Sequence, residues 1–287
     1  MKSGLSPDFF TSKDFMATIQ VNHLNPDTPF SSKLRAKLSE IKALTFLASL
    51  FCILCLVNGT KAQPATLWGL AGGGGDYTLG TIMSIKADGS NFSTEYSFPK
   101  IPGSSPSYTQ MISYNGKHYG LTAGGGNYDL GVLFEFDPNT GDYAALHHFD
   151  GISGANPYGS LLENGGKFYG MTGFGGIPGL GVIFEFDPAG SGSYQVLHEF
   201  DGTDGANPYG SLLLSGGKYY GLTSNGGSSD VGVMFYYDPS GSGSYQVLHE
   251  FGGTDGANPN GSLMESGGKF YGMTQVGGTN DMGLLFE

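Results

Sequence analysis

The feature that most constrains the fold is a unit of about 50 residues that recurs along most of the chain. One short phrase marks each copy: LWGLA at 67–71, HYGLT at 118–122, FYGMT at 168–172, YYGLT at 219–223 and FYGMT at 270–274. The copies follow one another at intervals of 51, 50, 51 and 51 residues. A period of this length is typical of β-propellers and related arrays, in which each unit buries its surface against its neighbours.

Composition indicates that the units are built from short strands. The 287 residues include 51 glycines, 20 phenylalanines and 17 tyrosines, whereas charged residues make up only 13%. So many aromatic residues argue against disorder, and so much glycine argues against a helical protein. We therefore expect many short strands joined by glycine turns.

The third copy shows the expected strands most clearly. Alternating or continuous apolar residues predict strands at 160–164, 168–172, 181–187 and 194–200, separated by the turns and loops GGK, GFGGIPGL and PAGSGS. Four strands in each unit predict an all-β, propeller-like array of four-stranded blades. The alternative is a β-solenoid, although solenoid coils are usually shorter and lack hairpins of this length.

The two ends of the array are expected to be incomplete. Residues 63–287 hold about four and a half blades, because the first unit lacks its first strand and the last stops within its third. We therefore expect an open, incomplete propeller. Its edge strands would be unpaired, and unpaired edges favour self-association.

Residues 1–62 form a long leader with the features of a secretory signal. Lysines and one arginine precede a single apolar run at 43–57, and Thr60 and Ala62 supply small residues before a cleavage site at Gln63. Fifteen apolar residues are too few to cross a bilayer, which needs about 20, although an uncleaved membrane anchor is the alternative. Cys52 and Cys55 lie inside this run and would be removed with it. We expect a secreted, extracellular or bacterial cell-surface protein, without a stable membrane span in the mature chain.

The charge balance excludes one class of partner. From Gln63 onward the chain has six lysines, no arginine and 21 acidic residues, which gives a net charge of about −15 at neutral pH. A chain with this charge repels phosphate backbones and anionic lipid surfaces, so we expect no nucleic-acid binding.

The repeated phrases resemble those of a known family. Tyr169 to Thr172, Gly175-Gly176, Gly181 to Pro188 and Leu197 to Gly202, with their counterparts in the other copies, resemble the GloVer-type tandem-repeat family of bacterial "choice-of-anchor" surface proteins. The resemblance covers about residues 65–287, and a looser one connects the unit with kelch-like β-propeller repeats. It implies a secreted, propeller-like protein attached to the cell envelope by a C-terminal sorting segment, and it implies no agreed catalytic activity. The residues up to Glu287 include no such segment, and we therefore expect the sequence to be a fragment of an open propeller.

One face of the array is the expected binding face. In a propeller, the loop between the second and third strands and the linker to the next blade emerge on the same side. The loops at 71–79, 123–130, 173–180, 224–231 and 275–282 supply acids, amides and aromatic rings of the kind that bind hydroxyl-rich glycans. The candidate residues are Asp76, Tyr77, Asn127, Tyr128, Asp129, Asp230, Asn280 and Asp281. The alternative explanation is structural, because Asn, Asp and Gly also allow the positive φ angles that loops need.

A second candidate is the phrase FDGTDGANPYGSLL at 200–213, which recurs at 149–162 and 251–264. Its acids resemble a calcium loop, but between copies the acids change while the glycines and the Ala-Asn-Pro triplets persist. Calcium would require the oxygen ligands to persist. We therefore interpret the phrase as a linker between blades. Only Asp201 and Asp204, in the copy with both acids, remain weak candidates for calcium, and no other cofactor is expected.

No catalytic constellation is evident in the sequence. His147, His198 and His249 recur at one position of the outer strand, so they are spread along the array and should pack between blades rather than share a metal ion. The preferred interpretation is a binding or adhesion scaffold for a glycan, a protein or a cation. The alternative is a secreted propeller-fold hydrolase or lyase that acts on polysaccharide.

Overall fold

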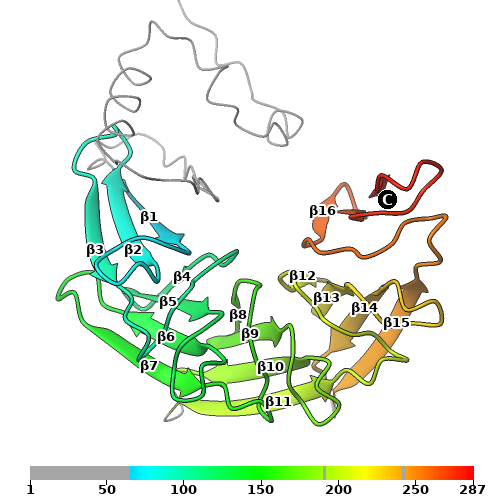
Figure 1. Ribbon diagram of the computed structural model, residues 1–287, viewed down its shortest axis with the longest axis horizontal. Coiled ribbons are helices and arrows are strands. Elements are labelled where there is room, and N and C mark those ends of the chain that lie inside the picture. Colours follow the sequence, from blue (N-terminus) through cyan, green and yellow to red (C-terminus); the bar gives the residue numbers. More distant parts are fainter. Residues whose placement is uncertain (1–64, 190–191, 241–242) are drawn as a thin grey trace, which may run out of the picture.

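The computed structural model describes residues 65–189, 192–240 and 243–287, and they form an all-β array. Five antiparallel sheets follow one another along the chain and form an open crescent (Figure 1). Three sheets have four strands, and the first and fifth have three. The fold predicted from the sequence, an open propeller-like array of small sheets, is confirmed.

The strands follow the alternating apolar pattern of each unit. The first sheet comprises β1 (Thr66–Ala71), β2 (Thr81–Lys86) and β3 (Ser93–Ser97). The second comprises β4 (Ile112–Tyr114), β5 (Lys117–Thr122), β6 (Val132–Phe136) and β7 (Tyr143–His148), and the third β8 (Leu162–Asn164), β9 (Lys167–Thr172), β10 (Val182–Asp187) and β11 (Ser193–Glu199). The fourth comprises β12 (Leu213–Ser215), β13 (Lys218–Thr223), β14 (Val233–Asp238) and β15 (Ser244–Glu250), and the fifth β16 (Met264–Ser266), β17 (Lys269–Met273) and β18 (Leu285–Phe286).

Within each sheet, strands that are consecutive in sequence are neighbours. The short first strands β4, β8 and β12 lie on the inner side of the crescent, and the outer strands β7, β11 and β15 lie on its outer side (Figure 1). A bulge recurs between the third and fourth strands, for example at Ile183/Phe184 in the pairing of β10 with β11. Because a bulge increases the local twist, the outer strand can follow the curve of the blade.

The core lies between the sheets. Phe184 and Phe186 of the third sheet are fully buried with Leu121 of the second sheet in one cluster, and equivalent clusters fill the other interfaces. Both faces of an internal sheet are therefore buried, which explains why apolar residues occur at successive positions of β6, β10 and β14.

The predicted leader, with its apolar run at 43–57, lies outside the described residues. Among the residues that the structure describes, no helix is long and apolar enough to cross a membrane.

Candidate functional site

The loops and linkers predicted to share one face are hydrogen-bonded to each other. The amide of Ala155, in the linker between the second and third sheets, donates to the carbonyl of Phe174 at 2.8 Å, and the amide of Phe174 donates back at 3.0 Å. The same bridge joins Ser104 to Gly124, Ala206 to Asn225 and Ala257 to Val276. We call this side of the array the loop face. It consists of the loops at 72–80, 123–131, 173–181, 224–232 and 274–284 and the linkers at 98–111, 149–161, 200–212 and 251–263.

The asparagine of each Ala-Asn-Pro triplet holds successive sheets together. Asn156 has a positive φ of 50°, and its side-chain Nδ2 donates to the carbonyl of Ala123 at 2.8 Å. Asn207 and Asn258 make the equivalent bonds to Gly173 and Ser224 at 2.9 Å. The repeated triplet is thus explained by its structural role.

Three of the predicted site residues stabilise their own loops. Asp129, Asp230 and Asp281 occupy equivalent positions with φ between 53° and 62°. The Oδ1 atom of each accepts a hydrogen bond from the backbone amide four residues earlier, at 2.9 to 3.1 Å. Asp129 also pairs with Lys100 at 2.8 Å, and this ion pair lowers the pKa of its carboxyl group. These contacts agree with the alternative explanation, in which the loop acids stabilise the loop conformation and do not bind a ligand.

The other predicted site residues leave their side chains exposed. Tyr77 and Tyr128 occupy equivalent positions and are 57% and 59% exposed. Asp76 and Asn127 precede them, and each uses its backbone amide to bond the end of the outer strand of its sheet. Among the described residues, neither the carboxylate of Asp76 nor the side-chain amide of Asn127 has a hydrogen-bond partner. Two loops therefore present an exposed ring beside an exposed polar group, and Asn280 of the fifth sheet is exposed as well.

A group of aromatic residues that the sequence analysis did not single out lies on the same face. The rings of Tyr158 and Tyr209 meet edge to face with centroids 5.4 Å apart, and Phe174 lies 6.2 Å from Tyr209. Burial raises the pKa of the Tyr209 hydroxyl. Gly173 lies against both tyrosines, because a Cβ atom there would be 3.0 to 3.1 Å from each ring. The repeats contain a signal that could have identified these tyrosines. The position of Tyr158 and Tyr209 is Asn260 in the next copy, whereas the residues on either side of it do not change.

The loop face collects most of the exposed apolar and aromatic side chains. Of the twelve large ones in the described part of the chain, eight lie on this face and four lie on β15 to β18. The eight are Tyr77, Ile101, Tyr108, Tyr128, Ile152, Phe174, Ile177 and Met282. The loop face therefore carries two thirds of the large exposed apolar and aromatic side chains of the described residues.

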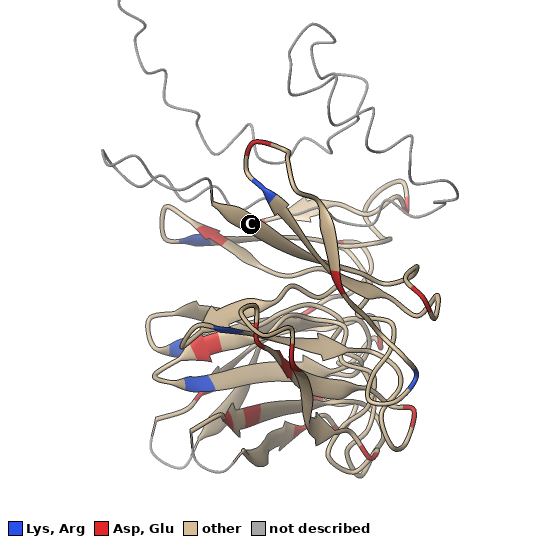
Figure 2. Cartoon of the chain, turned by 90° about the vertical axis from the view of Figure 1, so that its left-hand side faces the viewer, with Lys and Arg blue, Asp and Glu red and all other residues tan. Residues whose placement is uncertain are grey.

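The loop face is also acidic. Among the described residues, Lys100 is its one lysine and is paired with Asp129. Its loops and linkers carry Asp76, Asp129, Asp150, Asp201, Asp204, Asp230, Asp255 and Asp281. Figure 2 shows acidic loops on its right-hand side and the lysines mostly at the opposite end of the sheets. There, Lys117 and Lys167 pair with glutamates of their own sheets at 2.5 Å.

The two weak calcium candidates are engaged in local hydrogen bonds. Asp201 Oδ1 accepts bonds from the amide and hydroxyl of Thr203 at 2.8 and 2.7 Å and from the amide of Asp204. Asp204 accepts from the amide of Asp201 at 3.0 Å and contacts His198 Nε2 at 2.8 Å. In the described part of the chain, no group of three or more His, Cys, Asp or Glu side chains is arranged to hold a metal ion.

The recurrent histidines pack between sheets, as their position in the repeat predicted. The ring of His147 stacks on Tyr194 of the next sheet with centroids 3.8 Å apart, and His198 stacks in the same way on Tyr245 at 3.9 Å. Burial lowers the pKa of His147 to about 4. The two rings belong to different interfaces, so they do not converge on one site.

A family comparison agrees with this description. The family described as the Gloeobacter/Verrucomicrobia repeat matches residues 56–218 and, in a second match, residues 166–287. Together the matches span the whole array, and they confirm the resemblance seen in the repeated phrases. No curated protein matches the sequence.

Comparison with solved structures gives matches at low sequence identity. The extracellular domain of a protein described as a hybrid two-component system from B. thetaiotaomicron is 15% identical with a TM-score of 0.50, over 74% of this chain and 25% of that one. TolB from Acinetobacter baumannii is 13% identical with a TM-score of 0.44, over 75% of this chain and 54% of that one. A nidogen/laminin complex gives 14% identity and a TM-score of 0.41, over 61% and 57%. The chain therefore spans little more than half, or less, of these proteins. The match with a TM-score of 0.50 concerns the fold alone.

Proposed function

Because the chain belongs to the Gloeobacter/Verrucomicrobia repeat family and carries an aromatic, acidic loop face, we propose that it is a secreted or cell-surface scaffold that binds neutral glycans on that face. The propeller-like repeat array is the rigid support, and the loops are the variable part. The single observation that carries the proposal is the exposure of Tyr77 and Tyr128, each beside an unbonded polar side chain.

The chemistry of these two loops suits a sugar. A pyranose presents an apolar face that stacks on an aromatic ring, and a ring of hydroxyl groups that donate to carboxylates and amides. Tyr77 with Asp76, and Tyr128 with Asn127, supply both kinds of contact on adjacent sheets. The cluster of Tyr158, Tyr209 and Phe174 extends the aromatic surface to the third and fourth sheets.

The charge of the loop face narrows the class of glycan. Its acidic residues repel uronic acids, sulfated sugars and phosphorylated polymers, because like charges on binding surfaces lower affinity. The proposal is therefore for neutral polysaccharides such as glucans, xylans and mannans.

Secretion is the second part of the proposal, and it rests on the leader at residues 1–62. We expect export of the chain and removal of the leader before Gln63. N-terminal sequencing of the exported product in a bacterial host tests this directly. A product that keeps the apolar run at 43–57 and stays in the membrane would support the uncleaved anchor instead.

The binding proposal is tested by titrating the purified chain against a panel of neutral and acidic polysaccharides. We expect binding to at least one neutral polymer and weaker binding to its acidic relatives. Tyr77→Ala and Tyr128→Ala should each lower affinity roughly two- to tenfold, since stacking on one ring contributes about 0.5 to 1.5 kcal/mol. Gln195→Ala, an exposed change on the outer strand β11, is the matched control and should bind normally.

Two results would count against the proposal. The first is the absence of binding to any neutral polymer by a chain with a cooperative melting transition. The second is equal loss of affinity in Gln195→Ala and the tyrosine variants. Turnover of a polysaccharide in the same panel, abolished by a single carboxylate-to-amide change, would favour the hydrolase or lyase alternative.

A further inference from the structure

The outer strand of each of the first four sheets ends beside the loop that joins the second and third strands of the same unit. The last side chain of the strand accepts a hydrogen bond from a backbone amide of that loop, and we call this bond the strand-end contact. The acceptors are Ser97, His148, Glu199 and Glu250, and the donors are the amides of Asp76, Asn127, Ile177 and Ser228, at 3.3, 3.3, 3.2 and 2.7 Å. The contact is kept although the acceptor residue changes, so it is part of how the repeat holds its loop.

The glycine before each donor lies against the acceptor side chain. Gly126 has a φ of 78°, and a Cβ atom there would be 3.0 Å from Nδ1 of His148. Gly75 occupies the equivalent position with a φ of 75°, and its Cβ atom would be 2.9 Å from the hydroxyl oxygen of Ser97. The loop backbone therefore packs directly on the end of the outer strand, and its orientation depends on the side chain found there.

In two of these loops the strand-end contact holds the residue directly before an exposed tyrosine. Tyr77 and Tyr128 each follow the donor residue of their loop and are 57% and 59% exposed. In the third and fourth loops the same position is Pro178 or Ser229. Among these four loops, the contact thus positions an aromatic ring only in the two that form the proposed glycan site.

His148 differs from the other three acceptors because protonation removes its acceptor atom. A neutral imidazole accepts through Nδ1 while its proton is on Nε2, whereas an imidazolium carries N–H groups on both nitrogens and accepts at neither. Ser97 does not titrate, and hydrogen bonds from the hydroxyl and amide of Ser228 lower the pKa of the Glu250 carboxyl group. Histidine usually changes charge between about pH 5 and 8, so mild acid distinguishes the second loop from its neighbours.

The charged groups around His148 are bonded to other partners. Those on its own strand and on the elements packed against it are His147, Glu135 of β6, Asp129 of the loop, Lys100 of the preceding linker and Asp150 of the following one. Asp129 accepts from the amide of Gly125 and pairs with Lys100. Asp150 accepts from the amide and hydroxyl of Ser153, and Glu135 pairs with Lys117. None of these carboxylates is thus ready to replace Nδ1 as the acceptor for the Asn127 amide.

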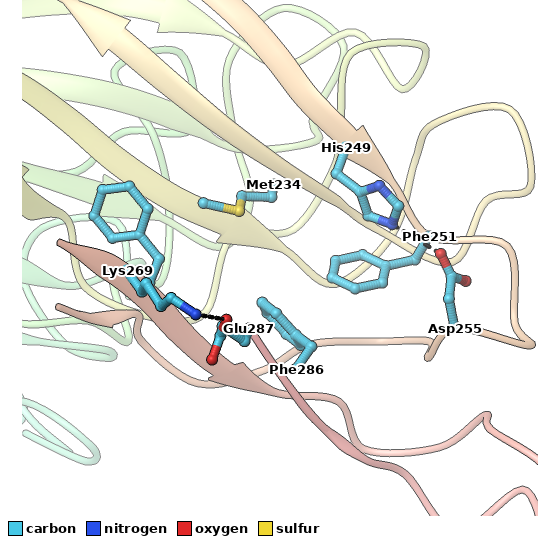
Figure 3. A pocket seen from close by; sticks show the side chains of 8 residues that line it. Met234, His249, Phe251, Asp255, Lys269, Phe286 and Glu287 are labelled. Carbon is cyan, nitrogen blue, oxygen red and sulfur yellow. Dashed lines mark hydrogen bonds and ion pairs between the residues drawn. The ribbon is translucent and has the colours of Figure 1, made fainter. Parts of the chain in front are cut away.

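The other histidines of the outer strands make contacts that survive protonation. His198 and His249 contact the carboxylates of linker aspartates at 2.8 Å, and Figure 3 shows the His249 ring bonded to Asp255. A carboxylate favours the protonated ring. His147 contacts a hydroxyl, which can either donate or accept. Among these four histidines, His148 is therefore the one whose bond requires the neutral ring.

We propose that His148 is a positioning residue for the Asn127-Tyr128 loop and makes this loop sensitive to pH. The neutral ring holds the Asn127 amide, and the loop then presents Tyr128 as described. Protonation turns an N–H group toward that amide, the bond is lost, and the loop loosens while the other three strand-end contacts persist. The consequence for ligand binding rests on the proposed glycan function, whereas the release of the loop does not.

The test is hydrogen exchange at the Asn127 amide of the folded chain, measured by NMR at about pH 7.5 and about pH 5.0. Exchange is expressed as protection relative to an unstructured chain at the same pH, which removes the intrinsic effect of pH on the rate. We expect protection to fall roughly fivefold in acid, as for the loss of one net hydrogen bond. The Ser228 amide, whose acceptor is Glu250, is the control within the same molecule and should keep its protection.

Two variants separate the titration of the ring from its packing. His148→Gln supplies an acceptor oxygen that does not titrate, so the Asn127 amide should stay protected at both pH values. His148→Ala supplies none, and protection should be low at both. The comparison of Asn127 with Ser228 uses unaltered protein, so it does not depend on whether the variants fold. Equal changes at the two amides overturn the proposal, and so does an unaltered pH dependence in His148→Gln.

Polysaccharide binding provides a second measurement. For a neutral polymer that binds at pH 7.5, affinity should fall about two- to fivefold at pH 5.0 in the unaltered chain and stay constant in His148→Gln. An equal fall in both proteins contradicts the role of His148 in positioning Tyr128. The absence of binding to any polymer overturns the proposed function instead, and the exchange measurement then decides this proposal by itself.

Discussion

The stacked rings between sheets show how one residue position sets the chemistry of an interface. The ring at this position is Tyr96, His147, His198 or His249 in successive sheets. Six residues later, the partner of His147 is the hydroxyl of Ser153, whereas His198 and His249 contact the carboxylates of Asp204 and Asp255. Two of these sites thus place a carboxylate beside the ring and one places a neutral hydroxyl there, although the three share a geometry.

His147 should make the array less stable in mild acid. Its pKa is lowered by burial from 6.5 to about 4 in the folded chain. Between these two values the unfolded chain binds a proton that the folded chain does not, so the free energy of unfolding falls as the pH is lowered. The loss begins near pH 6.5, is complete near pH 4, and amounts to roughly 1 to 3 kcal/mol. Urea denaturation at a series of pH values measures it.

Ser153→Asp should remove much of this loss. The new carboxylate occupies the position of Asp204, whose Oδ2 atom lies 2.8 Å from His198 Nε2, and it should raise the pKa of His147 in the folded chain. Ser153→Ala is the matched control, because it removes the hydroxyl without adding charge and should keep the dependence on pH. Parallel pH profiles for the two variants would contradict the assignment to His147.

The sequence predicted the roles of some individual residues in the array but not of others. The roles of His147 and His198 followed from the repeat, because a position that recurs in every unit faces the next unit. The loop acids were harder, since Asp129 and Asp76 look alike in sequence. The side chain of Asp129 accepts a hydrogen bond from the backbone of its own loop, whereas that of Asp76 does not. This difference arises because the two residues occupy different positions within the turn. Tyr158 and Tyr209 were not singled out because they lie in a linker that was interpreted as structural.

Among the elements, the second strand of each unit depends on a glycine that faces a phenylalanine. Gly170 of β9 is paired with Phe184 of β10, and a Cβ atom at Gly170 would lie 2.5 Å from the end of that ring. Gly120, Gly221 and Gly272 are placed in the same way against Phe134, Phe235 and Phe286. The glycine lets the ring lie flat across the neighbouring strand, where it reaches the core between sheets. This explains the glycine in the phrase that marks the repeat.

Gly170→Ala should therefore destabilise the array. The methyl group would push the fully buried Phe184 ring out of its place, at a cost of roughly 2 to 3 kcal/mol. Gly69→Ala is the matched control, because Gly69 occupies the same position in β1, faces Met83 instead of phenylalanine, and has no atom within 4 Å of an added Cβ. It should change the free energy of unfolding by less than about 1 kcal/mol. Equal losses in the two variants, measured by urea denaturation, would show that the cost is one of strand propensity rather than of contact with the ring.

The elements themselves could be predicted well from the sequence. Alternating residues such as those of VIFEFD and YQVLHEF gave strands close to β10 and β11, because the side-chain period of a strand is short enough to see in six residues. The bulge at Ile183/Phe184 could not be predicted. A bulge is set by the twist between two strands, and no residue in the sequence marks it.

At the scale of the whole molecule, the described array has an exposed face at its fifth sheet. Met171 and Leu222 are 1% and 2% exposed in the third and fourth sheets, where each faces the following sheet. Met273, at the equivalent position in the fifth sheet, is 56% exposed, and Leu285 beside it is 63% exposed. The periodic sequence predicted the open array, but which side chains it exposes depends on how the sheets stack.

When the segment of residues 63–287 is produced by itself, this face should drive its self-association. Burial of Met273 and Leu285 between two molecules removes apolar surface from water, as burial of Met171 and Leu222 does within one molecule. We expect the average mass in solution to rise with protein concentration. Met273→Lys together with Leu285→Lys should reduce this rise, because two new charges would have to be buried in the contact. Ile177→Lys is the control, since it changes an apolar residue on the loop face that is even more exposed, at 85%, and should associate like the unaltered chain. Light scattering across a concentration series measures the average mass of the unaltered chain and of both variants. If Ile177→Lys abolishes association and the double variant does not, the molecules meet through their loop faces, and the fifth sheet is not the contact.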